Sequence, residues 1–216
     1  MIWAFLALSY VVGATPTSYW VGRAFHGVDL RREGSGNLGA TNVYRVLGWK
    51  AAVPVVAVDI AKGWLPVGVF AGLAGASVSW TLAFGAAAIA GHVFSFWVGF
   101  RGGKGVATSA GVFVGLAPWA ALGAFVVWCA LTLPSGYVSL GSIGAAITLP
   151  VLIALTPHRG GSAVMLFSLA LATFVVWAHR ANVGRLLRGE ENRFGGRRRA
   201  SPDLDAGGGG TDRGGS

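Results

Sequence analysis

The stretch "AAVPVVAVDIAKGWLPVGVFAGLAG", residues 51–75, is apolar along its whole length except for Asp59 and Lys62. It exceeds the roughly 20 residues that a helix needs to cross the hydrocarbon core of a bilayer. A second run, "SAVMLFSLALATFVVWA" at residues 162–178, has no charged residue and is close to that length. Such runs are typical of membrane-spanning helices, so the chain is predicted to be an integral membrane protein.

The composition of the chain agrees with this prediction. Its mean hydropathy is +0.62, and only 12% of its residues are charged, against about 25% in soluble domains. The first 22 residues lack a basic start, so they are expected to stay as a span and not to be cleaved as a signal peptide. A single cysteine, Cys129, lies in an apolar run, which excludes a disulfide framework and a cysteine-based metal site.

We predict an all-α integral membrane protein with about seven transmembrane helices. Residues 106–134 are too long for one upright span and too short for two full ones. Pro118 marks a break, which favours a pair of short or partly re-entrant helices, although five crossings satisfy the same topology. The predicted spans are residues 2–22, 51–73, 77–98, 106–118, 119–134, 140–156 and 162–178.

The positive charge is concentrated in a few connecting segments. The net charge is +9, and all but Lys62 and Arg159 of the 17 lysines and arginines lie in residues 23–50, 101–104 or after Ala178. Cytoplasmic loops carry such an excess of positive charge. The N-terminus is therefore expected outside the cell and the C-terminus in the cytoplasm, which requires an odd number of crossings.

The chain is expected to hold one domain and a tail. Residues 1–193 form the polytopic transmembrane domain, and residues 194–216 form a disordered Arg/Gly-rich cytoplasmic tail, because they lack apolar periodicity. Asp59 and Lys62 are three residues apart on one helix face, so we expect them to pair with each other or with polar groups facing the bundle interior. A structural role is favoured over a catalytic one, with support of the cytoplasmic basin as the alternative. Close helix packing is expected at most of the glycines inside spans, which include Gly72, Gly75, Gly85, Gly91, Gly111 and Gly115.

The first polar segment is "REGSGNLGATNVYRVLGWK", residues 32–50. Glycines at 34, 36 and 39 would let backbone amides turn toward one anion, and Arg45 adds a fixed positive charge. A helix beginning after Asn42 would favour the same anion. A glycine-rich turn with a topology-setting arginine explains the segment equally well. Short side-chain donors come from Ser35, Asn37, Thr41 and Asn42.

The second polar segment is "GHVFSFWVGFRGGKGVATSAG", residues 91–111. Its "GGKG", residues 102–105, precedes an apolar helix and is typical of a phosphate cradle with free amides, one ammonium and a helix N-terminus. It is not a P-loop, because Val98 replaces the first glycine and Gly105 replaces the Ser or Thr, so nucleotide hydrolysis is not implied. The alternative is a basic loop that only sets topology.

The third polar segment, "HRANVGRLLRGEE", follows the last span at residues 179–191. His179, Asn182 and Arg185 are spaced so that they share one helical face. An interfacial helix whose arginines face lipid phosphate is the alternative. That alternative explains His179 and Asn182 poorly.

All three segments emerge on one side of the membrane and form a basic basin for anionic groups, more than one phosphate among them. No paired-carboxylate hydrolase site, no Ser–His–Asp elbow and no soft-metal ligand set is present in the sequence. A lone His92 is interpreted as a packed histidine at a span end and not as a metal ligand. The basin's cations are Arg45, Lys104, Arg180 and Arg185.

In this order the three segments resemble the bacterial acyl-phosphate:glycerol-3-phosphate acyltransferases, the PlsY family, over about residues 15–191. The resemblance implies a seven-helix enzyme of the bacterial cytoplasmic membrane with its active site on the cytoplasmic face. It would transfer the acyl group of acyl phosphate to the 1-hydroxyl of sn-glycerol 3-phosphate, giving lysophosphatidic acid and phosphate, the first step of phospholipid synthesis. No cofactor and no nucleic acid is expected. A monomer is expected, in contact with membrane lipid and with the enzyme that produces acyl phosphate.

The matching motifs imply the site residues. Beside the second motif, this chain has Ser95 where the family commonly has Pro, and Arg101 where it has Lys. No metal site is expected. Catalytic roles are expected for Ser35, Arg45, Lys104, His179 and Asn182. Substrate binding is expected for Gly36, Asn37, Gly39, Ala40, Thr41, Asn42, His92, Gly102, Gly103, Gly105, Ser139 and Glu191.

The histidines of the chain do not supply the HxxxxD pair that is common in acyltransferases using acyl-CoA. We therefore expect substrate-assisted transfer, in which the phosphate leaving group takes the hydroxyl proton and the protein supplies alignment and charge stabilisation. A small organic-phosphate transporter is the alternative function. It predicts binding groups near the bilayer midplane.

Overall fold

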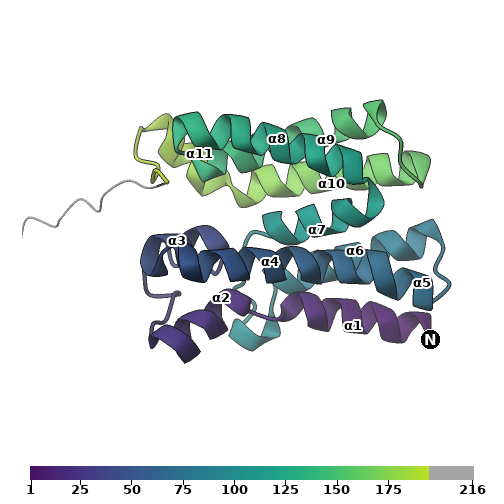
Figure 1. Cartoon of the computed structure of the whole chain (residues 1–216), viewed down its shortest axis with the longest axis horizontal. Helices are drawn as coiled ribbons and strands as arrows, with labels where there is room; N and C mark the ends of the chain where they lie inside the picture. The colour runs from purple at the N-terminus through teal and green to yellow at the C-terminus, as the bar shows by residue number, and fades with distance from the viewer. Residues whose placement is uncertain (195–216) are drawn as a thin grey trace, which may run out of the picture.

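A computed structural model describes residues 1–194, which form helices and loops without a strand (Figure 1). The predicted disordered tail, 194–216, lies outside the described residues except for Phe194. The principal helices are α1 (Ile2–Ala14), α4 (Trp49–Leu65), α6 (Val78–Val93), α7 (Val106–Leu116), α8 (Pro118–Ser135), α9 (Val138–Leu155) and α10 (Gly161–Ala178). The shorter ones are α2 (Thr17–Trp20), η1 (Val21–Phe25), α3 (Ala40–Leu47), η2 (Pro66–Phe70), α5 (Ala71–Leu73), η3 (Phe96–Val98) and α11 (Arg180–Leu187).

Each of the seven predicted spans contains a helix, which agrees with the predicted all-helical membrane protein. The helices α1 and α7 are shorter than a full span, with 13 and 11 residues. The N-terminus and α11 lie at opposite ends of the bundle, as an odd number of passes requires (Figure 1). Among residues 1–194, five helices are long and apolar enough to cross a membrane: Trp49–Leu73, Val78–Val98, Pro118–Ser135, Val138–Leu155 and Gly161–Ala178.

Two prolines decide where helices break. The predicted break at Pro118 is confirmed, because α7 ends at Leu116 and Pro118 opens α8. The first predicted span, 2–22, is corrected, because α1 already ends at Ala14. Thr15, which precedes Pro16, has φ −54° and ψ 111°, outside the helical region that a following proline disfavours.

Glycines let two pairs of helices pack backbone to backbone. A Cβ on Gly13 of α1 would lie 2.1 Å from the carbonyl oxygen of Ala88 in α6. A Cβ on Gly111 of α7 would lie 1.9 Å from the carbonyl oxygen of Ile60 in α4. Gly91 and Gly63 make the reciprocal approaches in the two pairs. Small residues at such crossings are how membrane helices come close.

The prediction of close packing for most of the six named glycines is confirmed, because four of them pack closely and two do not. A Cβ on Gly85 or Gly115 would meet the side chains of Val112 or Val67, in line with packing. Nothing lies within 4 Å of a Cβ placed on Gly72 or Gly75. These two glycines end the long α4–η2–α5 helix, where the chain turns and no neighbouring helix crosses.

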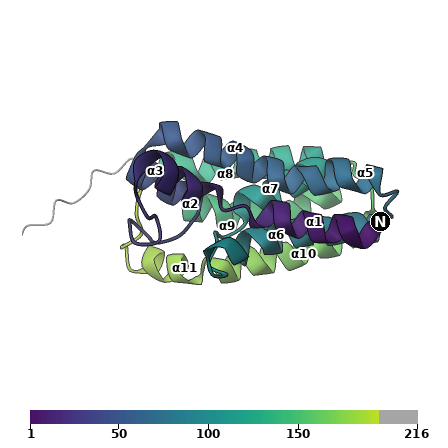
Figure 2. The same ribbon diagram turned by 90° about the horizontal axis from the view of Figure 1, so that it is seen from below.

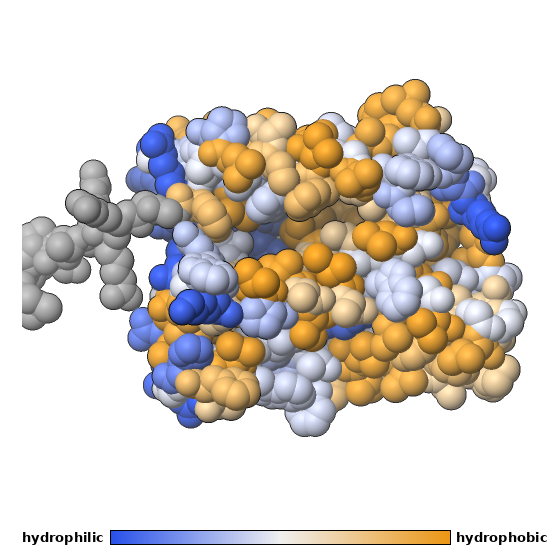
Figure 3. All heavy atoms as spheres, viewed as in Figure 1, coloured by the Kyte–Doolittle hydropathy of each residue, from blue (hydrophilic) through white to orange (hydrophobic). Residues whose placement is uncertain are grey.

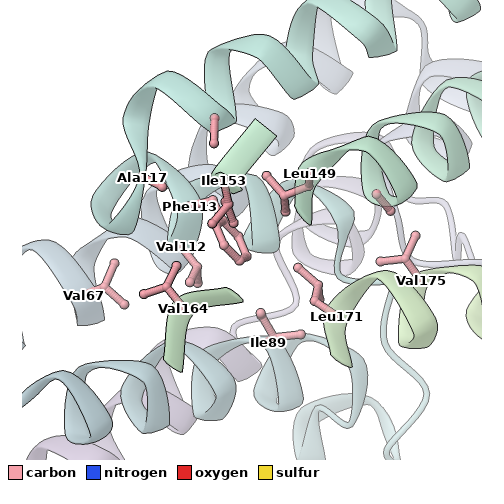
Figure 4. Packing of buried hydrophobic residues seen from close by; sticks show 12 residues of the cluster. Val67, Ile89, Val112, Phe113, Ala117, Leu149, Ile153, Val164, Leu171 and Val175 are labelled. Atoms are coloured by element: carbon pink, nitrogen blue, oxygen red, sulfur yellow. The ribbon is translucent and has the colours of Figure 1, made fainter. Parts of the chain in front are cut away.

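The apolar core gathers around α7, which lies between the α1–α6 group and the α8–α10 group (Figure 1). Phe113 and Val112 of α7 point into this cluster, with Ile89 from one side and Leu149 and Val175 from the other (Figure 4). The helix α7 is therefore the link between the two groups, and its starting point is held by both of them.

Polar connections collect at the end of the bundle opposite the N-terminus. Figure 2 shows α2, α3 and α11 together at that end, with the N-terminus at the other. In Figure 3 hydrophilic residues line the same end, whereas the flanks are mostly hydrophobic. The predicted convergence of the three polar segments on one side is confirmed.

Candidate functional site

A cavity of about 500 Å³ opens at the polar end and runs between the two helix groups. Figure 3 shows it as a hollow between the α8 side and the α4 side of the molecule. Its polar wall comes from segments far apart in the sequence. That wall comprises Ser35, Asn37, Gly39, Ala40, Thr41, Asn42, Arg45, Asp59, His92, Lys104, Gly105, Ser109, Ser139, Ser142, His179, Asn182, Arg185 and Glu191.

Four helices begin at this wall. The cavity is lined by the first residues of α3, α7, α9 and α11, or by the residues that cap them. The first amides of a helix have no partner within it and carry a partial positive charge. Four helix starts around one cavity therefore favour anions before any side chain is considered.

Cationic side chains add to this positive field. The Nε of Arg45 is buried and has no hydrogen-bond partner within residues 1–194. Lys104 Nζ donates a hydrogen bond to Asn182 Oδ1, which ties the start of α7 to α11. Burial lowers the pKa of Lys104 to about 8, and the nearby Arg185 and Arg45 add to this effect. Both cations are thus available to a phosphate group.

Glu191 holds one side of the site together. Its carboxylate accepts hydrogen bonds from Asn182 Nδ2 at 2.7 Å, Arg185 Nε at 2.7 Å and Ser139 Oγ at 3.0 Å. Burial raises the pKa of Glu191, but these three hydrogen bonds outweigh it and leave the pKa below its ordinary value. The adjacent Glu190 is exposed and pairs with Arg188 instead. Glu191 is therefore a positioning residue for Asn182 and, through it, for Lys104.

His179 sits between α10 and α11 with a defined tautomer. Its Nδ1 lies 2.8 Å from the carbonyl oxygen of Val175. A carbonyl oxygen only accepts, so Nδ1 carries the hydrogen and Nε2 keeps its lone pair. Burial and the charge of Lys104 lower the pKa of His179 to about 4. The ring is neutral at pH 7 and can accept a hydrogen bond at Nε2.

The loop before α3 differs from the predicted amide nest. Gly34 and Gly36 have φ of +61° and +69°, the left-handed region that glycine favours. Yet the Ser35 amide donates to Asn42 Oδ1 at 2.8 Å, and the Gly36 amide donates to the carbonyl of Glu33. These amides are thus used inside the loop. The helix α3 begins at Ala40, not after Asn42, so its own first amides face the cavity.

The loop before α7 also corrects the predicted cradle. The Gly102 amide donates to the carbonyl of Val93, and the Gly103 amide donates to the carbonyl of His92. A Cβ on Gly102 would lie 1.9 Å from the His92 carbonyl oxygen, and one on Gly103 would lie 2.2 Å from His92 Nε2. These glycines allow close packing and do not present free amides. The donors at this place are Lys104 and the first turn of α7.

The structure separates the predicted residues into two sets. Gly36, Gly102 and Gly103 do not line the cavity, and the other predicted site residues do. The expectation that Arg180 joins the basin is wrong. Arg180 is exposed and stacks on Trp177, 4.3 Å from the ring centroid, because it lies on the outer face of α11.

Four residues of the polar wall were not among the predicted site residues: Asp59, Ser109, Ser142 and Arg185. Arg185 was expected in the basin, and its place on the His179–Asn182 helix face is the signal that could have added it. Ser109 lies four residues after Gly105, and its buried hydroxyl has no partner within residues 1–194. Asp59 lines the cavity wall while paired to Lys62. Asp59 and Ser109 lie inside predicted spans, and hydropathy does not predict toward which neighbouring helix or cavity such a buried polar side chain points.

Beyond its polar wall the cavity becomes apolar. It continues between α4, α7, α8, α9 and α10, where no charged side chain lines it apart from Asp59. One enclosed space thus joins an anion-binding end to an apolar passage. The apolar lining includes Val56, Ile60, Phe113, Ala121, Ala124, Phe125, Trp128, Ala145, Ala146, Leu149, Leu171 and Val175.

Comparison with known proteins assigns this arrangement to a family. A model of the family described as glycerol-3-phosphate acyltransferase matches residues 3–189. The glycerol-3-phosphate acyltransferase of Geobacter sulfurreducens is 44% identical over 188 residues, covering 87% of this chain and 95% of the relative. That of Fusobacterium nucleatum is 43% identical over 190 residues, covering 88% and 96%.

Solved structures give the same result. The crystal structure of PlsY (YgiH), an integral membrane glycerol 3-phosphate acyltransferase, in its glycerol 3-phosphate form has a TM-score of 0.82 at 36% identity. The alignment covers 90% of this chain and 96% of that one. A second crystal structure of PlsY, in the lysophosphatidic acid form, has a TM-score of 0.80 at 36% identity and covers 90% and 95%.

Proposed function

The chain belongs to the glycerol-3-phosphate acyltransferase family, and from this premise we propose that acyl phosphate is its acyl donor and the 1-hydroxyl of sn-glycerol 3-phosphate its acceptor. The protein is an integral membrane acyltransferase, and its products are lysophosphatidic acid and inorganic phosphate. The observation that carries the proposal is the cavity itself, in which four helix starts and three cations adjoin an apolar passage.

The cavity matches the two substrates by charge and polarity. An acyl phosphate has an anionic head on an apolar chain, and glycerol 3-phosphate brings a second phosphate. Arg45, Lys104 and Arg185 come from three different helices or loops, so they can hold two phosphates at once. The apolar lining offers the acyl chain a path between the helices. A thioester donor would bring no phosphate to the reacting carbonyl.

The proposed reaction proceeds without a protein base. The glycerol 1-hydroxyl attacks the carbonyl carbon of the acyl phosphate, a new C–O ester bond forms, and the bond between that carbon and the phosphate oxygen breaks. The departing phosphate takes the hydroxyl proton. His179, whose pKa of about 4 makes it a poor base at pH 7, accepts a hydrogen bond from the hydroxyl and aligns it. Ser35, Arg45, Lys104 and the helix amides stabilise the developing negative charge.

The polar end is proposed to face the cytoplasm of a bacterium. The loops at that end carry most of the lysines and arginines, which supports this orientation. A cytoplasmic opening would also meet water-soluble glycerol 3-phosphate and an enzyme that delivers acyl phosphate. We propose that the protein acts there as a monomer, since the described residues of one chain form the whole cavity wall.

The experiment offers two donors to purified protein. Labelled glycerol 3-phosphate is followed into lysophosphatidic acid with palmitoyl phosphate or palmitoyl-CoA, in mild detergent. We expect turnover with palmitoyl phosphate only, and its loss in Lys104→Ala. Arg101→Ala is the matched control, because Arg101 is exposed on the same loop. Turnover with palmitoyl-CoA would overturn the proposed donor. No product from either would redirect work to phosphate flux in liposomes.

A further inference from the structure

Beneath the polar wall, α4 carries an ion pair that the proposed reaction does not use. Lys62 Nζ lies 2.8 Å from Asp59 Oδ1, and the two side chains are 4% and 3% exposed. This confirms the predicted pairing. Charged groups inside a membrane span are costly and mark function more often than stability. A buried pair can often be replaced by apolar residues without loss of stability. The pair therefore needs an explanation other than stability.

One side of the pair leads to the loop before α7. His92 Nδ1 lies 3.9 Å from Asp59 Oδ1, so the ring packs directly on the carboxylate. The opposite edge of the ring, at Nε2, faces Gly103, and the His92 carbonyl accepts the Gly103 amide. Gly103 immediately precedes Lys104. The His92 ring therefore lies between the Asp59–Lys62 pair and the loop that carries Lys104. It leaves no room for a Cβ on Gly103.

The other side of the pair leads to the loop before α3. Lys62 Nζ donates a hydrogen bond of 2.9 Å to the carbonyl of Thr15, where the chain turns between α1 and α2. Three residues later, Ser18 Oγ donates to the carbonyl of Leu38 at 2.6 Å. Leu38 directly precedes Gly39, the N-cap of α3. Two hydrogen bonds, Lys62 to Thr15 and Ser18 to Leu38, therefore connect the ammonium of Lys62 to the start of α3.

Both routes meet at a small polar cavity. Its volume is about 10 Å³, which is room for one water molecule and not for a substrate. The buried hydroxyl of Thr17 also lines this cavity. Residues of the pair, of His92 and of both loops line it: Pro16, Thr17, Ser18, Leu38, Asp59, Lys62, His92, Ser95, Gly102 and Gly103.

We propose that Asp59, Lys62 and His92 form a positioning hub that sets the distance between the α3 start and the α7 start. This proposal rests on the proposed function, because it concerns the distance at which the two phosphate-binding segments hold the two substrates. The three residues are positioning residues and act through Lys104 and the helix amides. Lys62 has a second task, since it neutralises a carboxylate that lines the wall of an anion site.

The test compares single and double substitutions in the full chain. Asp59→Asn/Lys62→Met removes both charges together, whereas Lys62→Met alone leaves the carboxylate unpaired. We expect the double variant to keep the wild-type Tm in detergent but to lose about a hundredfold in kcat, as misplaced reactants do. The single variant should in addition raise the KM for glycerol 3-phosphate. Val58→Met is the matched control, because Val58 is exposed on the same helix.

Two outcomes overturn the hub. One is a folded double variant with wild-type kcat and KM, which would make the pair purely structural. If the double variant does not fold, His92→Phe decides, because it leaves the ion pair intact. A folded His92→Phe with wild-type kinetics would overturn the hub as well. Kinetics are compared with whichever donor the wild type uses, so failure of the proposed donor remains distinguishable. The rise in Tm on adding glycerol 3-phosphate gives a readout independent of turnover.

Discussion

The loop before α3 and the loop before α7 are both glycine-rich, both end at a helix start, and both were expected to cradle phosphate with free amides. They differ in what holds them. The first loop is mostly exposed and is held chiefly by side chains: Asn42 bonds to the backbone of Leu30, Glu33 and Ser35, and Ser18 bonds to the carbonyl of Leu38. The second is held by backbone against His92. Glycine content alone does not tell a flexible nest from a closely packed loop.

The largest effect is expected for Gly102→Ala, in the loop before α7. The new Cβ would lie 1.9 Å from the His92 carbonyl oxygen, and backbone cannot move aside as a side chain can. The loop must shift and carry Lys104 with it, so we expect kcat/KM to fall about a hundredfold. The measurement is steady-state kinetics with both substrates.

Gly99→Ala is the control for that substitution. Gly99 has a positive φ, of +67°, unlike Gly102, and within residues 1–194 nothing lies within 4 Å of a Cβ there. Only backbone strain of roughly 1 kcal/mol is added, and it is remote from Lys104. Equal losses in the two variants would show that contact with His92 is not what makes Gly102 sensitive to substitution.

In the first loop the matching change is Asn42→Ala. It removes three hydrogen bonds and leaves the Ser35 amide and the Leu30 carbonyl without a partner, at roughly 1 kcal/mol or more each, whereas the Glu33 carbonyl keeps the Gly36 amide. We expect about a tenfold loss in kcat/KM and a lower Tm. Asn42→Asp keeps the acceptor for Ser35, so an intermediate Tm is expected. Wild-type values in both variants would contradict the bracing role of Asn42.

The pH dependence of kcat/KM tests the charge of Lys104 in the second loop. Lys104 in the second loop has a pKa of about 8, and it is cationic below that value. The kcat/KM, which reports the free enzyme, should therefore fall about tenfold per pH unit above pH 8. In Lys104→Arg the guanidinium keeps its proton, so any remaining activity should lack this decline. A wild-type profile that stays flat to pH 9.5 would contradict a cationic role for Lys104.

The smallest effect is expected for Gly39→Ala. Gly39 has φ −101°, which any residue can adopt, and a Cβ there would lie 2.9 Å from Asn37 Oδ1, the end of a flexible side chain. We expect kcat/KM within about threefold of wild type, because the Asn37 side chain can move aside and the backbone of Gly39 need not change. A loss as large as that of Gly102→Ala would mean that the first loop is packed as tightly as the second.

Much of the site could be predicted from the sequence. Hydropathy predicts which residues cross the membrane. The number of crossings between the polar segments then predicts that all three emerge on the same side, which is why they meet. The spacing of Asp59 and Lys62 predicted their pairing, which is local to one helix. Spacing places Arg185, and not Arg180, on the helical face of His179 and Asn182, but it does not say which face turns toward the cavity. Both arginines lie on one short helix, and whether each faces the cavity depends on how α11 is turned against α10.

What the sequence by itself determined is the class of the protein, the positions of its helices and the end at which its charges gather. These depend on local hydropathy and on the thickness of a bilayer. Only the tertiary structure decided which donors remain free for an anion. The amides of Gly102 and Gly103 bond to the carbonyls of Val93 and His92, and Glu191 reaches Ser139 across 52 residues of chain. Hydrogen bonds between distant segments leave no local pattern, because they depend on which helices pack together.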